Sequence, residues 1–546
     1  MTAAAVSGLD RGGRTVVVVG NGMVGHRFCE RLVAHDRDRR LRVVCFGEER
    51  RPAYDRVHLS DYFDGKTVDD LGLADRAWYE SRGITLHLGE RVTGIDRATR
   101  AVVSSAGRRV QYDALVLATG SAPFVPPLPG TELSGVFTYR TIEDVEHIQA
   151  WGARSHRAAV IGGGLLGLEA AKAALDMGLE TYVLEFAPRL MPRQVDAVGG
   201  EVLQQAVESM GVRVLVGART TAIVGDATVA GLALENDDLL DVDMVIVSAG
   251  IRARDELARE AGLQVGPRGG IVVDDGLRTS DPAVYAIGES ALHRETIYGL
   301  VGPGYEMADV LAARFCGQDR RFTGTDLSAK LKLLGIDVAS FGDAFAERPG
   351  ARSVVYEDRL RNVYQKLVLS TDGERLVGGI LVGDAGPYPT LLALMRQERP
   401  LPARPHELLF GTGDPPEAAP ALGDEAQVCS CNNVTKGQIR RAIAEDALCT
   451  VGGVKACTRA GTGCGGCVPL VAQLLEAELA AAGREVNRNV CEHFAFTRQE
   501  LFQIVKLGRI RTFEELLASH GAGSGCEVCR PAVASILAST WNDFVL

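Results

Sequence analysis

The chain contains the same local pattern twice: an apolar run, a turn with three glycines, a helix-like segment and a second apolar run. Residues 14–49 read RTVVVVGNGMVGHRFCERLVAHDRDRRLRVVCFGEE, and residues 157–185 read RAAVIGGGLLGLEAAKAALDMGLETYVLE. Strands that alternate with helices in this way form parallel sheets covered by helices. The sequence therefore predicts an α/β fold with two parallel sheets.

The first glycine turn is Gly20-x-Gly22-x-x-Gly25, between the run VVVV and the following helix. The first glycine allows a tight turn, the second lets a pyrophosphate approach the backbone, and the third lets helix and strand pack closely. Glu48 follows the next strand and is the candidate to accept a hydrogen bond from a ribose hydroxyl. A tight turn that binds nothing is the alternative, but the flanking strand, helix and acid favour a Rossmann-like dinucleotide-binding domain.

The second glycine turn predicts a second dinucleotide site. Its glycines are Gly162, Gly164 and Gly167. Glu185 follows 18 residues after the last of them, at a predicted strand end. A carboxylate there accepts from a free 2′-hydroxyl and repels a 2′-phosphate, which favours NADH over NADPH. Arg189 and Arg193 are close by in sequence, so NADPH stays an alternative.

The cysteines are concentrated near the end of the chain. Nine of the twelve fall between Cys429 and Cys529, which in a reducing compartment indicates metal or redox chemistry more often than disulfides. Two close pairs, separated by 32 residues predicted to form a helical hairpin, are Cys429 with Cys431 and Cys464 with Cys467. By count, four thiolates suit a 2Fe–2S cluster or a zinc ion.

A diverged copy of this pattern follows after a shift of 62 residues. Its corresponding positions are Cys491, His493, Cys526 and Cys529. Both copies have a Thr-x-x-Gln/Glu capping box, at Thr435 and at Thr497, and Thr512 opens another. Two small helical modules are therefore predicted. With one imidazole in place of a thiolate the second could still hold a cluster, but a copy retained for docking or packing is the favoured interpretation.

Composition limits the partners and the compartment. The net charge of −11 argues mildly against nucleic acid, and no run approaches the roughly 18 apolar residues needed to span a bilayer. The first residues have no apolar core of signal-peptide length, so we expect a cytoplasmic protein. Six of the 21 prolines lie between Pro400 and Pro420, which predicts a linker.

Three further motifs make the chain resemble the flavoproteins with two dinucleotide-binding domains. They are YDALVLATGSAPFVPPLPG from Tyr112, VDMVIVSAGIRARDELA from Val242 and TSDPAVYAIGE from Thr279. The resemblance implies FAD on the first glycine turn and NAD on the second. It also implies that Thr119-Gly120 and Gly288-Glu289 lie at the FAD site, with Glu289 reaching the ribityl chain.

The same resemblance makes Arg56 a candidate partner of the FAD pyrophosphate, with a solvated loop arginine as the alternative. Some members carry a redox-active Cys-x4-Cys beside the flavin. The corresponding segment, Arg51 to Lys66, has no cysteine, which argues against disulfide reductase chemistry.

The resemblance also suggests domain limits. The FAD-binding domain would comprise residues 1–122 and 271–320, the NAD-binding domain 123–270, and a small α+β interface domain 321–399. A proline-rich linker at 400–426 would lead to a module at 427–480 that resembles the bacterioferritin-associated-ferredoxin-like (BFD-like) 2Fe–2S domain. The diverged module would occupy 488–540.

The order of parts is similar to the N-terminal portion of the assimilatory NAD(P)H-dependent nitrite reductase large subunits. This implies an NADH-dependent FAD oxidoreductase that passes electrons through a 2Fe–2S cluster to a sirohaem centre on another domain or subunit. Sirohaem and a 4Fe–4S cluster are not expected on this chain, because its remaining cysteines lack Cys-x5-Cys and Cys-x3-Cys spacings. The alternatives are an electron-transfer subunit for assimilatory nitrate reductase, a ferredoxin-type acceptor, and an NADH oxidase with zinc-binding docking modules.

Overall fold

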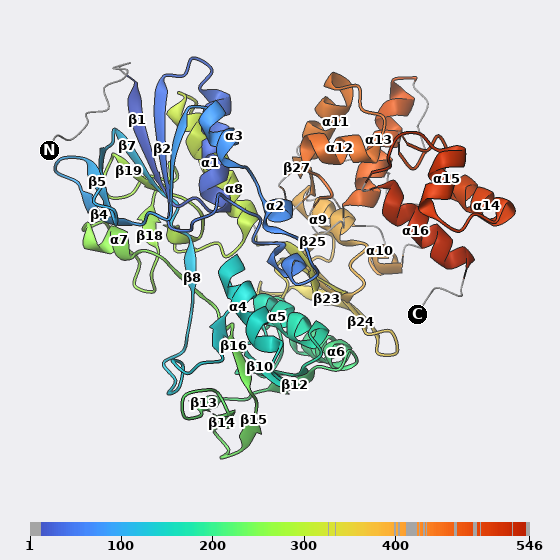
Figure 1. Cartoon of the computed structure of the whole chain (residues 1–546), viewed down its shortest axis with the longest axis horizontal. Helices are drawn as coiled ribbons and strands as arrows, with labels where there is room; N and C mark the ends of the chain where they lie inside the picture. The colour runs from blue at the N-terminus through green and yellow to red at the C-terminus, as the bar shows by residue number, and fades with distance from the viewer. Residues whose placement is uncertain are drawn as a thin grey trace. The chain divides into compact units, whose positions relative to one another are not determined.

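The computed structural model places two compact units, Met1–Leu409 and Phe410–Leu546, and each is described here by itself (Figure 1). The described residues are 13–325, 327–333, 335–397, 400, 401, 404–410, 423, 424, 426–429, 432, 434–462, 467–483, 489–491, 493–526 and 528–541. The predicted ligands Cys431 and Cys464, and most of the predicted linker, lie outside them. Within the described part, none of the helices is both long enough and apolar enough to cross a bilayer.

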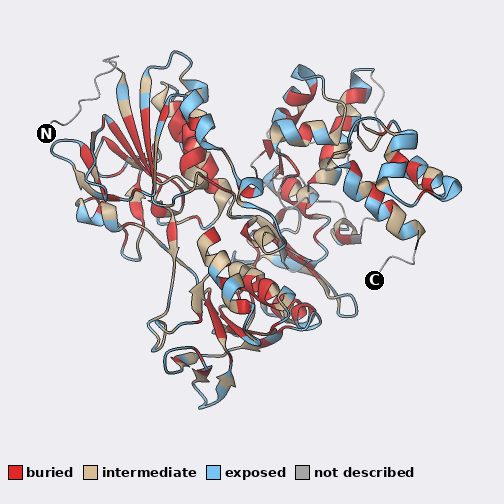
Figure 2. Cartoon of the chain, viewed as in Figure 1, coloured by how far each residue is buried: buried red, intermediate tan, exposed pale blue. Residues whose placement is uncertain are grey.

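The first sheet is parallel and surrounds the strand that precedes the first glycine turn. In spatial order its strands are β19 (Val284–Ala286), β7 (Ala114–Leu117), β1 (Arg14–Val19), β2 (Leu41–Gly47) and β3 (Ile84–Leu88). Val16 pairs with Val43 on one side and with Ala114 on the other. The apolar run of β1 is buried (Figure 2), as expected for the central strand of a parallel sheet. Helices α1 (Met23–His35) and α8 (Val301–Phe315) pack against each other in this domain.

The second sheet is also five-stranded and surrounds the strand that precedes the second glycine turn. Its strands are β9 (Val136–Thr138), β16 (Met244–Val247), β10 (Arg157–Ile161), β11 (Glu180–Glu185) and β12 (Arg213–Val216), all parallel. It differs from the first sheet in its edge strand β9, which comes first in the chain rather than last. Its helices are α4 (Ile142–Gly152), α5 (Leu165–Asp176) and α6 (Ala197–Glu208). The predicted pair of parallel α/β domains is therefore confirmed.

Smaller elements surround the two parallel sheets. Each domain carries an antiparallel three-stranded sheet: β4 (Val92–Asp96), β5 (Ala101–Ser104) and β6 (Arg109–Gln111) in the first, and β13 (Thr220–Val224), β14 (Gly231–Leu234) and β15 (Leu239–Asp241) in the second. An antiparallel ribbon of β8 (Ser121–Pro123) and β17 (Ile251–Ala253) lies where the chain passes between the domains. The remaining elements are η1 (Leu59–Tyr62), α2 (Val68–Leu71), α3 (Arg76–Ser81), α7 (Glu256–Glu260), β18 (Ile271–Val273), η2 (Gly288–Ser290) and β20 (Ala291–His293).

A five-stranded antiparallel sheet and two helices follow the parallel domains. The strands are, in spatial order, β21 (Ala329–Leu333), β22 (Ile336–Gly342), β25 (Leu376–Gly383), β24 (Val363–Leu369) and β23 (Arg352–Asp358), followed by α9 (Tyr388–Arg396) and α10 (Glu407–Phe410). Asp196, the N-cap of α6, accepts hydrogen bonds from the Tyr364 hydroxyl at 2.8 Å and from Lys366 Nζ at 3.0 Å. These partly buried polar contacts join this sheet to the second parallel domain.

The described residues of the second unit form two three-helix modules with separate apolar cores. The first has strands β26 (Gln427–Cys429) and β27 (Val434–Thr435) and helices α11 (Lys436–Glu445), α12 (Val451–Thr458) and α13 (Val468–Ala481). The second has helices α14 (Arg498–Gly508), α15 (Phe513–His520) and α16 (Cys529–Thr540). This correspondence confirms the predicted repeat.

The predicted capping boxes are present in full at α11 and α14 but only in part at α15. Thr435 and Thr497 each accept from the backbone N–H three residues on, while Gln438 and Glu500 accept from the N-cap backbone. At α15, Thr512 accepts from Glu515 N, but the Glu515 carboxylate accepts from Arg511 N, one residue before the expected donor.

Candidate cofactor sites

The first glycine turn has no room for side chains at its ends and is open in its middle. Gly20 has φ +112°, and a Cβ there would lie 2.1 Å from the Ala118 carbonyl oxygen. A Cβ on Gly25 would lie 2.0 Å from the Gly20 carbonyl oxygen, whereas nothing lies within 4 Å of one on Gly22. Gly22 is also the N-cap of α1 and provides no side-chain cap, so the first N–H groups of the helix can meet a phosphate.

The second glycine turn has the same geometry. Gly162 has φ +119°, and a Cβ on it would lie 2.3 Å from the Ser248 carbonyl oxygen. A Cβ on Gly167 would lie 1.9 Å from the Gly162 carbonyl oxygen, and again nothing lies within 4 Å of one on Gly164, the N-cap of α5. Both turns therefore fit a dinucleotide pyrophosphate.

Glu185 stands beside the second turn at the end of β11. Its carboxylate accepts hydrogen bonds from Gly163 N and from Ala187 N, both at 2.7 Å. Two backbone donors hold the carboxylate in place, while its remaining lone pairs can accept from ribose hydroxyls. The Arg189 guanidinium donates to the carbonyl oxygens of Val195 at 2.9 Å and Pro192 at 3.3 Å. These bonds occupy one of the two guanidinium groups that kept NADPH as an alternative; the other, Arg193, is exposed.

The charged groups predicted at the first turn have protein partners. The Glu48 carboxylate forms ion pairs with Arg254 and, at 3.6 Å, with Arg91, and it is 44% exposed. Arg56 pairs with Glu49 and lies 5.1 Å from the centre of the Tyr54 ring. Glu48 directly follows β2, and Arg56 pairs with the next residue, Glu49, so both predicted groups are linked to the segment after that strand.

Glu289 belongs to a polar cluster that includes two residues without a local sequence signal. Its Oε2 accepts from the Ser121 hydroxyl at 2.6 Å and from Arg140 Nη2 at 2.7 Å. Its neighbour Gly288 has φ +75°. Arg140 lies 149 residues away in the sequence and was not predicted as a site residue.

Thr119-Gly120, the other motif predicted at the FAD site, is hydrogen-bonded to the segment that follows β17. The Thr119 hydroxyl donates to the Arg254 carbonyl oxygen at 2.6 Å, and Gly120 has φ +69°. Because Arg254 also pairs with Glu48, one residue after β17 contacts two of the predicted FAD-site positions. Sequence reasoning missed this residue as well.

A carboxyl group on α5 has an altered pKa close to the second glycine turn. Burial raises the pKa of Glu169 to about 7; the Asp61 carboxylate adds to the rise and His58 opposes it. Burial and the charge of Glu169 also raise the pKa of Tyr139. Glu169 can therefore hold a proton near neutral pH.

The first cysteine module brings together the two predicted ligands that are described. A hydrogen bond from the Cys467 thiol, together with backbone N–H groups and against the effect of burial, lowers the pKa of Cys429 to about 6. Both side chains are buried. A thiol that ionises near neutral pH is suited to metal ligation. Cys457 lies outside this pair and is exposed.

The second module brings all four of its predicted ligands together. The ligand atoms of Cys491, His493, Cys526 and Cys529 lie within 4.8 Å of one another. Cys491 Sγ is 3.6 Å from His493 Nδ1, and Cys526 Sγ is 3.8 Å from Cys529 Sγ. A purely apolar packing role would not need this convergence of three sulfurs and an imidazole.

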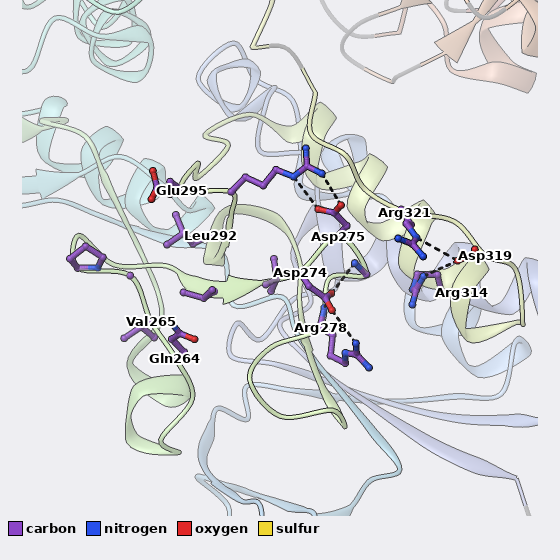
Figure 3. A pocket seen from close by; sticks show the side chains of 16 residues that line it. Gln264, Val265, Asp274, Asp275, Arg278, Leu292, Glu295, Arg314, Asp319 and Arg321 are labelled. Carbon is purple, nitrogen blue, oxygen red and sulfur yellow. Dashed lines mark hydrogen bonds and ion pairs between the residues drawn. The ribbon is translucent and has the colours of Figure 1, made fainter.

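A cavity of about 800 Å³ lies beside β18 and β20, apart from the predicted site residues (Figure 3). Its charged groups face one another in pairs: Arg294 with Asp275 at 2.7 Å, Arg278 with Asp274 at 3.2 Å, and Asp319 with Arg314 at 3.6 Å and Arg321 at 3.8 Å. With Glu295 the lining has four carboxylates and four guanidinium groups, so it does not select an anion or a cation.

Three family models match this chain. The pyridine nucleotide-disulphide oxidoreductase model matches residues 14–308, which include both glycine turns and Glu289. The chain belongs to this family. The rubredoxin NAD⁺ reductase C-terminal domain matches residues 328–399, and the BFD-like [2Fe-2S] binding domain matches 427–477 and again 489–539.

Individual proteins resemble this chain over most of its length. The nitrite reductase (NADH) large subunit of Escherichia coli (strain K12) is 50% identical over 97% of this chain and 63% of its own length. The assimilatory nitrate reductase electron transfer subunit of Bacillus subtilis (strain 168) is 34% identical over 97% of this chain and 69% of its own length. A solved ferredoxin reductase from Rhodopseudomonas palustris is 25% identical with a TM-score of 0.65, covering 73% of this chain and 100% of that one.

These matches assign the chain to the NAD(P)H-dependent flavoprotein oxidoreductases, with FAD and a 2Fe–2S cluster as cofactors. The open glycine turns fit the nucleotides, and the hydrogen-bonded thiols of Cys429 and Cys467, one from each predicted ligand pair, fit a metal cluster. The chain spans 63% of the E. coli relative and 56% of the nitrite reductase [NAD(P)H] large subunit of Klebsiella oxytoca.

Proposed function

We propose that this chain takes electrons from NADH and delivers them, through its cysteine module, to a sirohaem nitrite reductase centre outside residues 1–546. Similarity over 97% of the chain to a nitrite reductase (NADH) large subunit carries the proposal. FAD, when bound, accepts a hydride and gives up single electrons, which a 2Fe–2S cluster takes one at a time.

The residues have distinct roles in this proposal. Gly20, Gly22 and Gly25 hold the FAD pyrophosphate, Glu48 and Arg56 bind its ribose and phosphates, and Thr119, Gly120, Gly288 and Glu289 orient its flavin half. Gly162, Gly164 and Gly167 hold the NADH pyrophosphate, and Glu185 binds the adenosine ribose. Cys429, Cys431, Cys464 and Cys467 ligate the cluster.

The domain limits given by the sequence are part of the proposal. Residues 1–122 with 271–320 bind FAD, 123–270 bind NADH, 321–399 form the interface domain, and 400–426 link it to the modules at 427–480 and 488–540. A reducing cytoplasm would keep the cysteines available as ligands.

The experiment supplies the purified chain with NADH and tests nitrite consumption with and without a sirohaem nitrite reductase protein. We expect nitrite-dependent NADH oxidation only when the sirohaem protein is present. Reduction of added one-electron acceptors without any coupling to the sirohaem protein would contradict the proposed partner.

A second candidate is electron supply to an assimilatory nitrate reductase. The B. subtilis nitrate reductase electron transfer subunit supports it, because 69% of that protein is covered by this chain. Replacing the sirohaem protein by a molybdenum nitrate reductase in the same assay separates the two. Coupling to nitrate but not to nitrite would favour this candidate.

A further inference from the structure

The two cysteine modules differ in the metal centre that their ligands fit. The BFD-like [2Fe-2S] binding domain matches both modules, but His493 replaces a cysteine in the second. All four ligand atoms of the second module lie within 4.8 Å of one another. This includes atoms from opposite pairs, Cys491 with His493 and Cys526 with Cys529.

This compactness matches a single tetrahedral ion. Ligand atoms bound at about 2.0–2.3 Å to a tetrahedral zinc ion are roughly 3.5–3.8 Å from one another. The distance from Cys491 Sγ to His493 Nδ1 is 3.6 Å, and that from Cys526 Sγ to Cys529 Sγ is 3.8 Å. Both of these distances lie within a ligand pair, and a two-iron cluster would share them. The limit of 4.8 Å across the pairs is what favours a single ion, because a two-iron cluster assigns one pair to each iron and so separates the pairs.

We propose that Cys491, His493, Cys526 and Cys529 bind one tetrahedral zinc ion rather than a 2Fe–2S cluster. Three thiolates and one imidazole form a common ligand set of structural zinc sites. Zinc does not change its oxidation state, so this site takes no electrons. It joins the segment before α14 to the start of α16 and stabilises a module that has only a small apolar core.

The protein around the ligands supports this geometry. His493 N donates to Cys491 Sγ at 3.3 Å, and Cys526 N donates to Cys529 Sγ at 3.1 Å. Such N–H groups offset the negative charge of metal-bound thiolates. Ala522 N donates to the His493 carbonyl oxygen at 2.9 Å, which joins the two ligand-bearing segments. A Cβ on Gly523 would lie 3.0 Å from His493 Cδ2, so glycine there lets the ring turn Nδ1 towards Cys491.

The test is metal analysis of the full-length chain, purified from cells supplied with both iron and zinc. We expect about one zinc, two irons and two acid-labile sulfides per FAD. Zinc-edge X-ray absorption should show three sulfurs at about 2.3 Å and one nitrogen at about 2.0–2.1 Å. Four irons and four sulfides per FAD without zinc, two irons without zinc, or zinc with only oxygen ligands would each overturn the proposal.

Two matched variants locate the metals. Cys526→Ser should lose the zinc and keep the iron, the sulfide and the electron paramagnetic resonance signal of the reduced cluster. Cys429→Ser should lose the iron and keep the zinc. Loss of iron from Cys526→Ser would overturn the zinc assignment. Absence of iron from the wild-type chain would contradict the proposed function, but the zinc content of the chain would still test the zinc site. If Cys526→Ser does not fold, the zinc-edge X-ray absorption spectrum of the wild type still shows whether zinc has three sulfur ligands and one nitrogen ligand.

Discussion

Single residues beside the second glycine turn give a prediction of the nucleotide that it accepts. The Glu185 carboxylate is fixed by the backbone N–H groups of Gly163 and Ala187, and its other lone pairs remain for a ligand. The adjacent Arg189 guanidinium donates to backbone carbonyls rather than extending as a partner for a 2′-phosphate. Both features favour a nucleotide with a free 2′-hydroxyl.

Glu185→Gln should therefore weaken NADH more than NADPH. Hydrogen bonds to a charged group contribute roughly 1.5–3 kcal/mol, so we expect the KM for NADH to rise about tenfold or more. NADPH should lose little, because the substitution also removes a repulsion. Steady-state flavin reduction with each nucleotide measures the ratio, and Glu180→Gln, at the other end of β11, is the control. An equal rise in both KM values would remove the assignment.

Glu169 gives a prediction for pH. Because burial raises its pKa from 4.5 to about 7, its contribution to folding is complete below pH 4.5 and is lost as the pH rises through 7. Glu169→Gln stays neutral throughout. The Tm of the variant minus that of the wild type should therefore increase between pH 4.5 and 7.5 and then level off. Thermal unfolding followed by circular dichroism measures both curves, and parallel curves would contradict the burial of an ionisable group.

At the scale of elements, the two glycine turns have the same geometry. In each, the first and third glycines let strand and helix approach, and the middle glycine faces open space. The sheets around them share the order of four strands, with β1 and β10 in equivalent positions, and differ in the edge strand, which comes last in the chain in the first sheet (β19) and first in the second (β9). A side chain at the middle glycine would therefore interfere with ligand binding without disturbing the fold.

Gly164→Ala should keep the fold and weaken NADH binding. A Cβ there meets no atom within 4 Å, so stability should change by less than about 0.5 kcal/mol, while the methyl group occupies the space of the pyrophosphate. Fluorescence titration should show the Kd for NADH rising roughly tenfold, the effect of about 1.4 kcal/mol. Gly94→Ala in β4 also meets nothing within 4 Å and should alter neither quantity. Unchanged NADH binding in Gly164→Ala would show that the nucleotide does not approach this turn.

Elements with local signals were predictable from the sequence, and contacts across long separations were not. Glycine spacing and Thr-x-x-Gln/Glu boxes act within a few residues, so Gly20 and Thr435 could be placed before the fold was known. Arg140 reaches Glu289 only because the chain returns to the first sheet after the second domain. The ion pair between Asp196 and Lys366 joins residues 170 positions apart in the sequence and depends on the packing of two domains. The convergence of the four ligands in the second cysteine module likewise depends on how α14 to α16 fold around it.

At the scale of the whole molecule, the chain combines a two-electron nucleotide chemistry with a one-electron metal chemistry in two separate compact units. The first unit contains both glycine turns, and the second contains both cysteine modules. The division means that loss of the first cysteine site should leave flavin reduction by NADH intact. It also means that the two half-reactions can be measured independently in one variant.

Cys467→Ser tests this division. The Cys467 thiol stabilises the Cys429 thiolate, so its loss removes one predicted ligand and raises the pKa of another. NADH should still bleach the flavin absorption in stopped-flow measurements, while reduction of a one-electron acceptor protein should fall at least roughly tenfold, since the cluster lacks one of its four thiolates. Cys457→Ser is the control, because that thiol is exposed and bonds only to Asp446 among the described residues. If Cys467→Ser kept its full rate with the acceptor, electrons would leave directly from the flavin, and the cysteine module would serve another purpose.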